Sequence, residues 1–241
     1  MSSLVKQPLA LFILLATNLA FASQDEIIVT GQKLQRYSSD SVPYIVLDKK
    51  ADYVLVGYQI ICDTRDRNKR LSEITDSLND LIKKAGKRDD IQLSTIIEYE
   101  DDYETLYFPI PFEKFDGDLL DAQYGRSDTS KMDVVIKMPV TSAIQSLEQA
   151  EELIDRFVDT VSMKGRTEAI TDGEVRLSIV NLERYRPELL QKIQADLKSN
   201  QATFSGTEVQ VSGLENVLRW ERVGELDLKV YLPYEISITV K

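Results

Sequence analysis

Histidine is absent from this chain, which narrows the chemistry that its side chains can perform. None of the 241 residues is histidine, one is cysteine, and 40 are aspartate or glutamate. Without imidazole the chain cannot build a Ser-His-Asp or Cys-His catalytic arrangement, and it lacks the commonest ligand of zinc, copper and haem. Glycine-rich phosphate loops and nucleophile elbows are absent from the sequence too. We therefore name no catalytic, cofactor-binding or metal-ligating residue, and we expect a protein that is not an enzyme.

Acidic residues gather in the middle of the chain, where they could bind a cation such as calcium. The residues are Glu98, Glu100, Asp101, Asp102 and Glu104, followed by Asp116, Asp118 and Asp121 around Gly117. Neither group fits the calcium loop of about twelve residues that ends in a bidentate glutamate. We interpret both groups as solvated surface. A carboxylate-dependent hydrolase stays an alternative, since 40 acids allow many spatial pairs of the glycosidase kind.

Aromatic residues interleave with these acids and give the same region a second interpretation. Tyr99, Tyr103, Tyr107 and Phe108 could form a recognition surface for a partner or a glycan. Ordinary packing within strands explains them equally well. Trp220, further along the chain, is interpreted as packing on a sheet rather than as a platform for a ligand.

Four cations lie close together around the start of a predicted helix: Arg65, Arg67, Lys69 and Arg70. The dipole of a helix favours acids at that end, so these cations could bind an anion or an acidic surface. Asp63 and Asp66 lie among them, however, and a solvated, salt-bridged turn is the interpretation that we favour. The lone cysteine, Cys62, precedes this turn in an apolar stretch. We expect a buried thiol rather than an exposed one that cross-links two chains.

Alternating strands and helices are predicted to position these side chains. Apolar patterns predict strands at residues 26–30, 44–47, 53–62, 91–99, 105–110, 133–140, 174–180 and 207–211. One helix is predicted over residues 71–85, with Gly86 as its C-terminal cap, and a second after Ser142, which forms a capping box with Gln145. A third begins near Pro187, with Leu190, Ile193 and Leu197 inward. The order of strand, helix and strand occurs twice, which predicts an α+β fold with amphipathic helices on a mixed sheet.

A β-hairpin is predicted to end the fold. Its first strand covers residues 217–223, its turn is Gly224-Glu225, and its return strand runs over residues 228–240. Alternate residues of the return strand are apolar, so one face of it should be buried. Pro233 has no N–H to donate, so this strand should lie at an edge or bend there.

The first residues predict export from the cytoplasm. A single cation, Lys6, precedes an apolar run over residues 9–19, and Ala20-Phe21-Ala22 has the small-x-small pattern of signal peptidase sites. We expect residues 1–22 to be a signal peptide that is cleaved after Ala22, which leaves a periplasmic chain at residues 23–241. Cys62 is too far downstream for lipidation, and no later apolar run is long enough to span a membrane.

The charge of the chain restricts its partners. The formal net charge is −11, so the surface should repel nucleic acid and anionic lipid. About 219 residues remain after the leader, enough for one large domain or for two halves at residues 26–110 and 131–241, joined by the irregular acidic segment.

The order of elements resembles the SIMPL domain family of exported bacterial proteins, also called DUF541. The resemblance rests on Ile27-Ile28-Val29-Thr30-Gly31 soon after the leader, the strand Tyr53–Cys62, and the helix that ends at Ala85-Gly86. Asp90-Ile91 with Ser94-Thr95 follows, and a second strand-helix-strand module begins at Asp133. The resemblance implies an α+β fold, residence in the periplasm or outer envelope, and in some members assembly into large rings. It implies no catalytic residues.

These observations predict a non-catalytic envelope protein of the SIMPL type that self-associates or binds an envelope protein partner. A module that binds a small ligand, a peptide or a cation through residues 100–130 is the alternative, followed by the carboxylate-dependent hydrolase.

Overall fold

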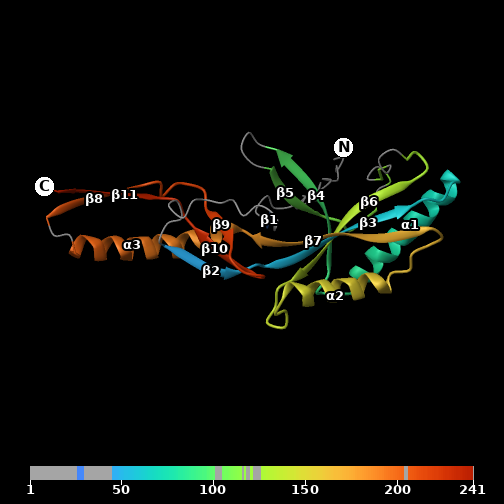
Figure 1. The fold of residues 1–241 in the computed structure, drawn as a ribbon, viewed down its shortest axis with the longest axis horizontal. Helices are drawn as coiled ribbons and strands as arrows, with labels where there is room; N and C mark the ends of the chain where they lie inside the picture. Colours follow the sequence, from blue (N-terminus) through green and yellow to red (C-terminus); the bar gives the residue numbers. More distant parts are fainter. Residues whose placement is uncertain are drawn as a thin grey trace, which may run out of the picture.

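The computed structural model describes residues 26–29, 45–100, 105–115, 117, 120–121, 126–203 and 206–240. The predicted signal peptide, residues 1–22, lies outside the described residues. Helices and antiparallel sheets together make up the described chain, which confirms the α+β class (Figure 1).

One six-stranded sheet forms the body of the molecule. Its order is β1 (Glu26–Val29), β7 (Thr167–Val180), β3 (Tyr53–Cys62), β6 (Ser130–Pro139), β4 (Gln92–Glu100) and β5 (Thr105–Pro111). Each neighbouring pair is antiparallel, so the prediction of a mixed sheet is wrong. The helices still link parallel strands, because β6 lies between β3 and β4, and β3 lies between β6 and β7. This split strand-helix-strand arrangement is the one found in ferredoxin-like folds.

The two linking helices, α1 (Arg67–Ala85) and α2 (Leu147–Thr160), share one core with the sheet. The core combines one side of α1 and α2 with alternate residues of β3 and β6. Asp66 caps α1 by accepting a hydrogen bond from Lys69 N at 2.8 Å. Helix α2 begins later than predicted, because its N-cap is Ser146, which accepts from Gln149 N. The predicted Ser142 lies in the preceding turn.

The opposite face of the six-stranded sheet carries a smaller apolar cluster of Leu55 and Val135, with Tyr53 and Ile96 against it. The two outer strands, β1 and β5, approach each other, so the sheet is strongly curved. Strand β7 is longer than predicted and contains an irregularity opposite Gly57, where its register with β3 shifts.

The C-terminal part of the chain forms two further sheets. Strands β2 (Val46–Lys50), β10 (Asp227–Tyr231) and β9 (Arg219–Arg222) pair in the order β2-β10-β9. A short 3-10 helix (Leu182–Tyr185) leads into α3 (Arg186–Thr203), which is followed by β8 (Thr207–Ser212). Strand β8 pairs with β11 (Glu235–Val240), and this pair extends beside α3 at the end of the molecule opposite α1 (Figure 1).

The predicted terminal hairpin is confirmed in its first part and corrected in its second. Strands β9 and β10 pair as expected, although their connection spans residues 223–226 rather than two residues. The return strand breaks at Pro233, as its missing N–H predicted, and resumes as β11 on a different partner. Its buried face ends there too. Leu228 and Leu232 have no exposed surface, whereas Ile238 is 46% exposed, so the continuous buried face predicted for this strand is wrong.

Candidate functional site

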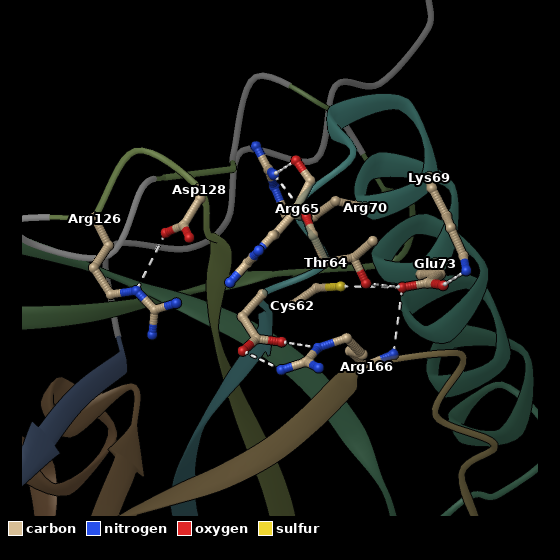
Figure 2. A network of polar contacts seen from close by, with 10 residues as sticks. Cys62, Thr64, Arg65, Lys69, Arg70, Glu73, Arg126, Asp128 and Arg166 are labelled. Carbon is tan, nitrogen blue, oxygen red and sulfur yellow. Dashed lines mark hydrogen bonds and ion pairs between the residues drawn. The ribbon is translucent and has the colours of Figure 1, made fainter.

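The carboxylate of Glu73 on α1 is the centre of a polar network at the end of β3 (Figure 2). Its Oε2 atom accepts from Thr64 Oγ1 at 2.5 Å, from the backbone N of Arg166 at 3.3 Å, and from Cys62 Sγ at 3.5 Å. Lys69 Nζ lies 3.7 Å from the other oxygen. The hydrogen bond from Thr64 lowers the pKa of Glu73 below its ordinary value of 4.5. This carboxylate therefore joins three segments of the chain as an ionised acceptor.

Side chains from successive turns of α1 bind the backbone of residues 162–166, which follow α2. The bonds run from Ser162 N to Asp80 at 2.7 Å, from Lys164 N to Ser77 at 2.9 Å, and from Arg166 N to Glu73. We call Glu73, Ser77 and Asp80 the α1 polar stripe. Two extended residues span about 6.6 Å and one helical turn about 5.4 Å, so the two repeats nearly match. The stripe thus supplies acceptors that this irregular segment would otherwise lack.

Gly165 allows the segment to lie directly against the carboxylate. Its φ is +57°, and a Cβ atom built on it would lie 2.0 Å from the carboxyl carbon of Glu73. Any side chain at this position would displace the carboxylate from its donors, so the close approach requires glycine.

The predicted basic cluster divides into buried and exposed members. Arg70 is 6% exposed and donates to Thr64 O at 2.8 Å and to Ser130 Oγ at 3.1 Å. The interpretation as a solvated turn is therefore wrong for Arg70, because its guanidinium holds the end of β3 to the start of β6. The other three, Arg65, Arg67 and Lys69, are exposed as predicted.

An ion pair covers the outer side of this network. Arg166 donates to both oxygens of Asp63 at 2.5 and 2.7 Å, a bidentate geometry. The hydrogen bond from Arg166 lowers the pKa of Asp63, and the same bond raises the pKa of Arg166. Beneath the pair, the thiol of Cys62 has no exposed surface, which confirms the prediction of a buried cysteine. In this arrangement the buried thiol donates to the Glu73 carboxylate at 3.5 Å.

A second polar cluster lies on the other face of the sheet. Lys137 is 5% exposed and forms an ion pair with Glu26 of β1. Ser178 Oγ donates to the same carboxylate at 2.7 Å, and Lys137 Nζ lies 4.4 Å from the centre of the Tyr53 ring. These contacts hold the short strand β1 onto the sheet.

Tyr58 is the residue whose acidity is most changed by the fold. Burial and then its hydrogen bond to Asp155 of α2 raise the pKa of the Tyr58 phenol far above its ordinary value. The phenol therefore stays protonated and acts as a donor that connects β3 to α2.

The predicted acidic and aromatic surfaces fall largely outside the described residues. Residues 101–104, 116 and 118 are not described, nor are the side chains of Glu98, Glu100, Tyr99, Tyr107 and Phe108, which lie on β4 and β5. Asp121 exchanges two backbone hydrogen bonds with Lys131. Within the described part of the chain, no group of acidic residues and cysteine is arranged to hold a metal ion. Trp220 is partly buried on β9 opposite Val230, as its packing interpretation predicted.

The α1 polar stripe was not among the predicted sites, although the sequence contains a signal for it. Glu73, Ser77 and Asp80 recur at steps of four and three residues beside the apolar stripe of the same helix. Such a pattern is usually a solvated helix face. What distinguishes this one is the segment that lies against it, which comes from about 90 residues further along the chain.

We expect the variant Glu73→Gln to lower the midpoint of thermal unfolding at pH 7 by about 3–6 °C, through loss of the charge-assisted bonds. The folded pKa of Glu73 is below its ordinary 4.5, so its contribution is present above pH 4.5 and is lost as pH falls through the folded value. The difference between variant and wild type should therefore shrink as pH falls below 4.5. Thermal unfolding followed by circular dichroism from pH 3 to pH 7 measures it.

Glu188→Gln is the matched control, because Glu188 forms an exposed ion pair with Lys49 at 3.0 Å. It should shift the midpoint by less than about 1 °C at every pH. A pH-independent difference between Glu73→Gln and the wild type would contradict the role of the ionised carboxylate.

A scan against models of known protein families found no match for this chain, and a search of curated proteins found none either. Among the described helices, none combines the length and the apolar character needed to cross a bilayer. We therefore base the functional interpretation on the geometry of the polar networks and of the sheet edges.

Proposed function

We propose that this chain is an exported envelope protein of the SIMPL type, which acts in the periplasm after cleavage following Ala22. Its activity is the binding of other proteins, either further copies of itself or an envelope partner. The proposal is supported by two properties of the described residues. The Glu73 carboxylate and the Cys62 thiol bond to groups of the protein itself, and the apolar side chain of Ile238 is exposed at the end of the molecule opposite α1.

The observation that carries the proposal is the ribbon formed by β8 and β11. These two strands make a sheet of their own, to which no other described strand adds. Two-stranded sheets are only marginally stable in water unless something packs on them or extends them. Helix α3 lies beside the ribbon, yet Ile238 remains 46% exposed. A strand pair with open edges and an exposed isoleucine is a surface on which another protein can pack.

The polar networks support binding rather than catalysis. The Glu73 carboxylate accepts from three donors of its own chain, and the Cys62 thiol beside it is completely covered. A catalytic carboxylate must instead reach a substrate. The same residues tie the end of β3 and α1 to the segment that precedes β7, so they hold the fold together.

The native mass of the chain that starts at Ser23 tests the proposal. Light scattering after size exclusion should give a discrete multiple of about 25 kDa, at ~110 Da per residue. A monomer at all concentrations, with no protein retained on the immobilised chain from an envelope extract, would contradict protein binding. The module that binds a small ligand or a cation would then replace it.

A further inference from the structure

The ribbon of β8 and β11 has fewer charged residues along its edges than the other open sheet edges that the structure describes. Edge strands usually carry charged residues that discourage pairing with another chain. Strands β2 (Val46–Lys50) and β9 (Arg219–Arg222) each have three charged residues, whereas β8 (Thr207–Ser212) and β11 (Glu235–Val240) have one each. The edges formed by β1 and β5 lie against each other. Strand β11 also has no proline or glycine to prevent the addition of a strand.

The ribbon has one apolar face, which the rest of the described chain covers incompletely. Ile236 lies opposite Val211, and Ile238 lies opposite Val209, so these four side chains share a face. Ile236 and both valines are half-buried, but Ile238 is 46% exposed, so the apolar face is more open on β11 than on β8. The alternate residues Glu235, Ser237 and Thr239 are exposed on the polar face. Burial thus stops at the open edge of β11.

We propose that β11 pairs antiparallel with β11 of a second copy of this chain, about a two-fold axis at Ser237. In this register Ser237 faces Ser237, Ile236 faces Ile238, and Glu235 faces Thr239. No like charges are opposed, and each isoleucine meets an isoleucine of the other copy. The inference rests on the proposed self-association and specifies the interface that performs it.

Strand addition at this edge would extend the marginally stable two-stranded sheet and would cover the exposed side chain of Ile238. The two pairs would merge into one antiparallel sheet of four strands, which is large enough to be stable when one face is packed. A two-fold axis perpendicular to the sheet keeps both apolar faces on the same side. Ile238 would then be covered by Ile236 of the other copy. Backbone hydrogen bonds along the edge supply the remaining affinity.

Substitution at the two-fold axis tests the register. Ser237→Lys places two ammonium groups directly opposite each other, so we expect the association measured by light scattering to weaken by ~100-fold or more. Ser237→Glu should do the same. Because Ser237 is exposed at an edge, both variants should fold like the wild type. An equal mixture of Ser237→Lys and Ser237→Glu should recover the assembly, because opposite charges then face each other.

Disulfide formation tests directly whether the two copies of residue 237 lie opposite each other. Residues opposite each other in an antiparallel pair have Cα atoms about 4.5–5.5 Å apart, within the range of a disulfide. Ser237→Cys should therefore cross-link two chains under mild oxidation, and the buried Cys62 should not interfere. Gln210→Cys is the matched control, because Gln210 is exposed on β8, directly opposite Ser237, and lies one strand away from the proposed β11 interface, so it should not cross-link.

The outcomes separate this interface from self-association in general. If the wild type assembles while Ser237→Lys keeps the same mass, or Ser237→Cys does not cross-link, then the β11 interface is wrong and self-association stands. If the wild type is a monomer at the highest concentration tested, both are wrong. Assembly that is lost in each charged variant and recovered in their mixture supports the interface.

Discussion

Replacement of Lys137 by methionine is expected to lower the free energy of unfolding by about 3–5 kcal/mol. The ammonium group and the Glu26 carboxylate form an ion pair whose side chains are only 6% and 14% exposed. Methionine fills a similar volume but leaves the carboxylate largely buried with Ser178 as its remaining donor. The loss of one partner from a covered pair is costly, because the remaining charge is no longer hydrated. Urea unfolding at pH 7 measures the effect.

Two further variants test whether the loss of stability comes from the unpaired Glu26 carboxylate or simply from replacing a lysine. The double variant Lys137→Met with Glu26→Leu removes both charges and should recover most of the lost stability, to within about 1 kcal/mol of the wild type. Lys131→Met is the matched control, because Lys131 lies on the same strand and the same face as Lys137. Its ion-pair partner, Asp133, is 56% exposed and therefore stays hydrated when the lysine is removed. It should cost less than about 1 kcal/mol. Equal losses in the two lysine variants would contradict the assignment of a buried pair.

Replacement of Gly165 by alanine is expected to lower the free energy of unfolding by about 3 kcal/mol. The left-handed conformation at φ +57° accounts for about 1 kcal/mol. The remainder arises because the new Cβ would lie 2.0 Å from the Glu73 carboxyl carbon. That carboxyl group cannot move away without losing the hydrogen bonds from Thr64 and Arg166, and a bond to a charged group contributes about 1.5–3 kcal/mol.

Gly173→Ala is the control for backbone conformation alone. Its φ is +73°, but no atom lies within 4 Å of the position that a Cβ would take. We expect a cost of about 1 kcal/mol, so the difference between the two alanine variants isolates the contact with Glu73. A difference near zero would show that the carboxylate moves aside easily, and the polar network would then be looser than described.

The elements that the sequence predicted correctly are those whose signal is local. Strand β3 is a run of β-branched and aromatic residues, and it was predicted with the bounds that it has. Helix α1 follows from apolar residues at three- and four-residue steps, of which Ile74, Leu78 and Leu81 are fully buried. The break at Pro233 follows from a missing N–H. Each of these properties depends on neighbours within about one turn or one strand.

The errors concern contacts between distant segments. Alternation over residues 228–240 predicted one continuous buried face, but alternation shows only which residues share a face, not what covers it. Leu228 packs in the main hydrophobic core, whereas Ile238 is 46% exposed. Arg70 belongs to a cluster that is polar by composition, yet the fold places it against Ser130 and Thr64. The start of α2 was misplaced because Ser142 and Ser146 are both suitable caps, and only Ser146 precedes the turn that packs on the core.

Composition and periodicity are properties of the chain, so they were enough to predict the α+β class, the order of strands and helices, and the absence of histidine chemistry. Tertiary structure alone decided that the sheets are antiparallel and that Glu73 receives donors from residues far away in the chain. It also decided that β11 leaves the three-stranded sheet to pair with β8. The physical reason is that a hydrogen-bond donor, a buried charge and a sheet edge acquire their energies from the groups that face them, and those groups are brought there by the fold.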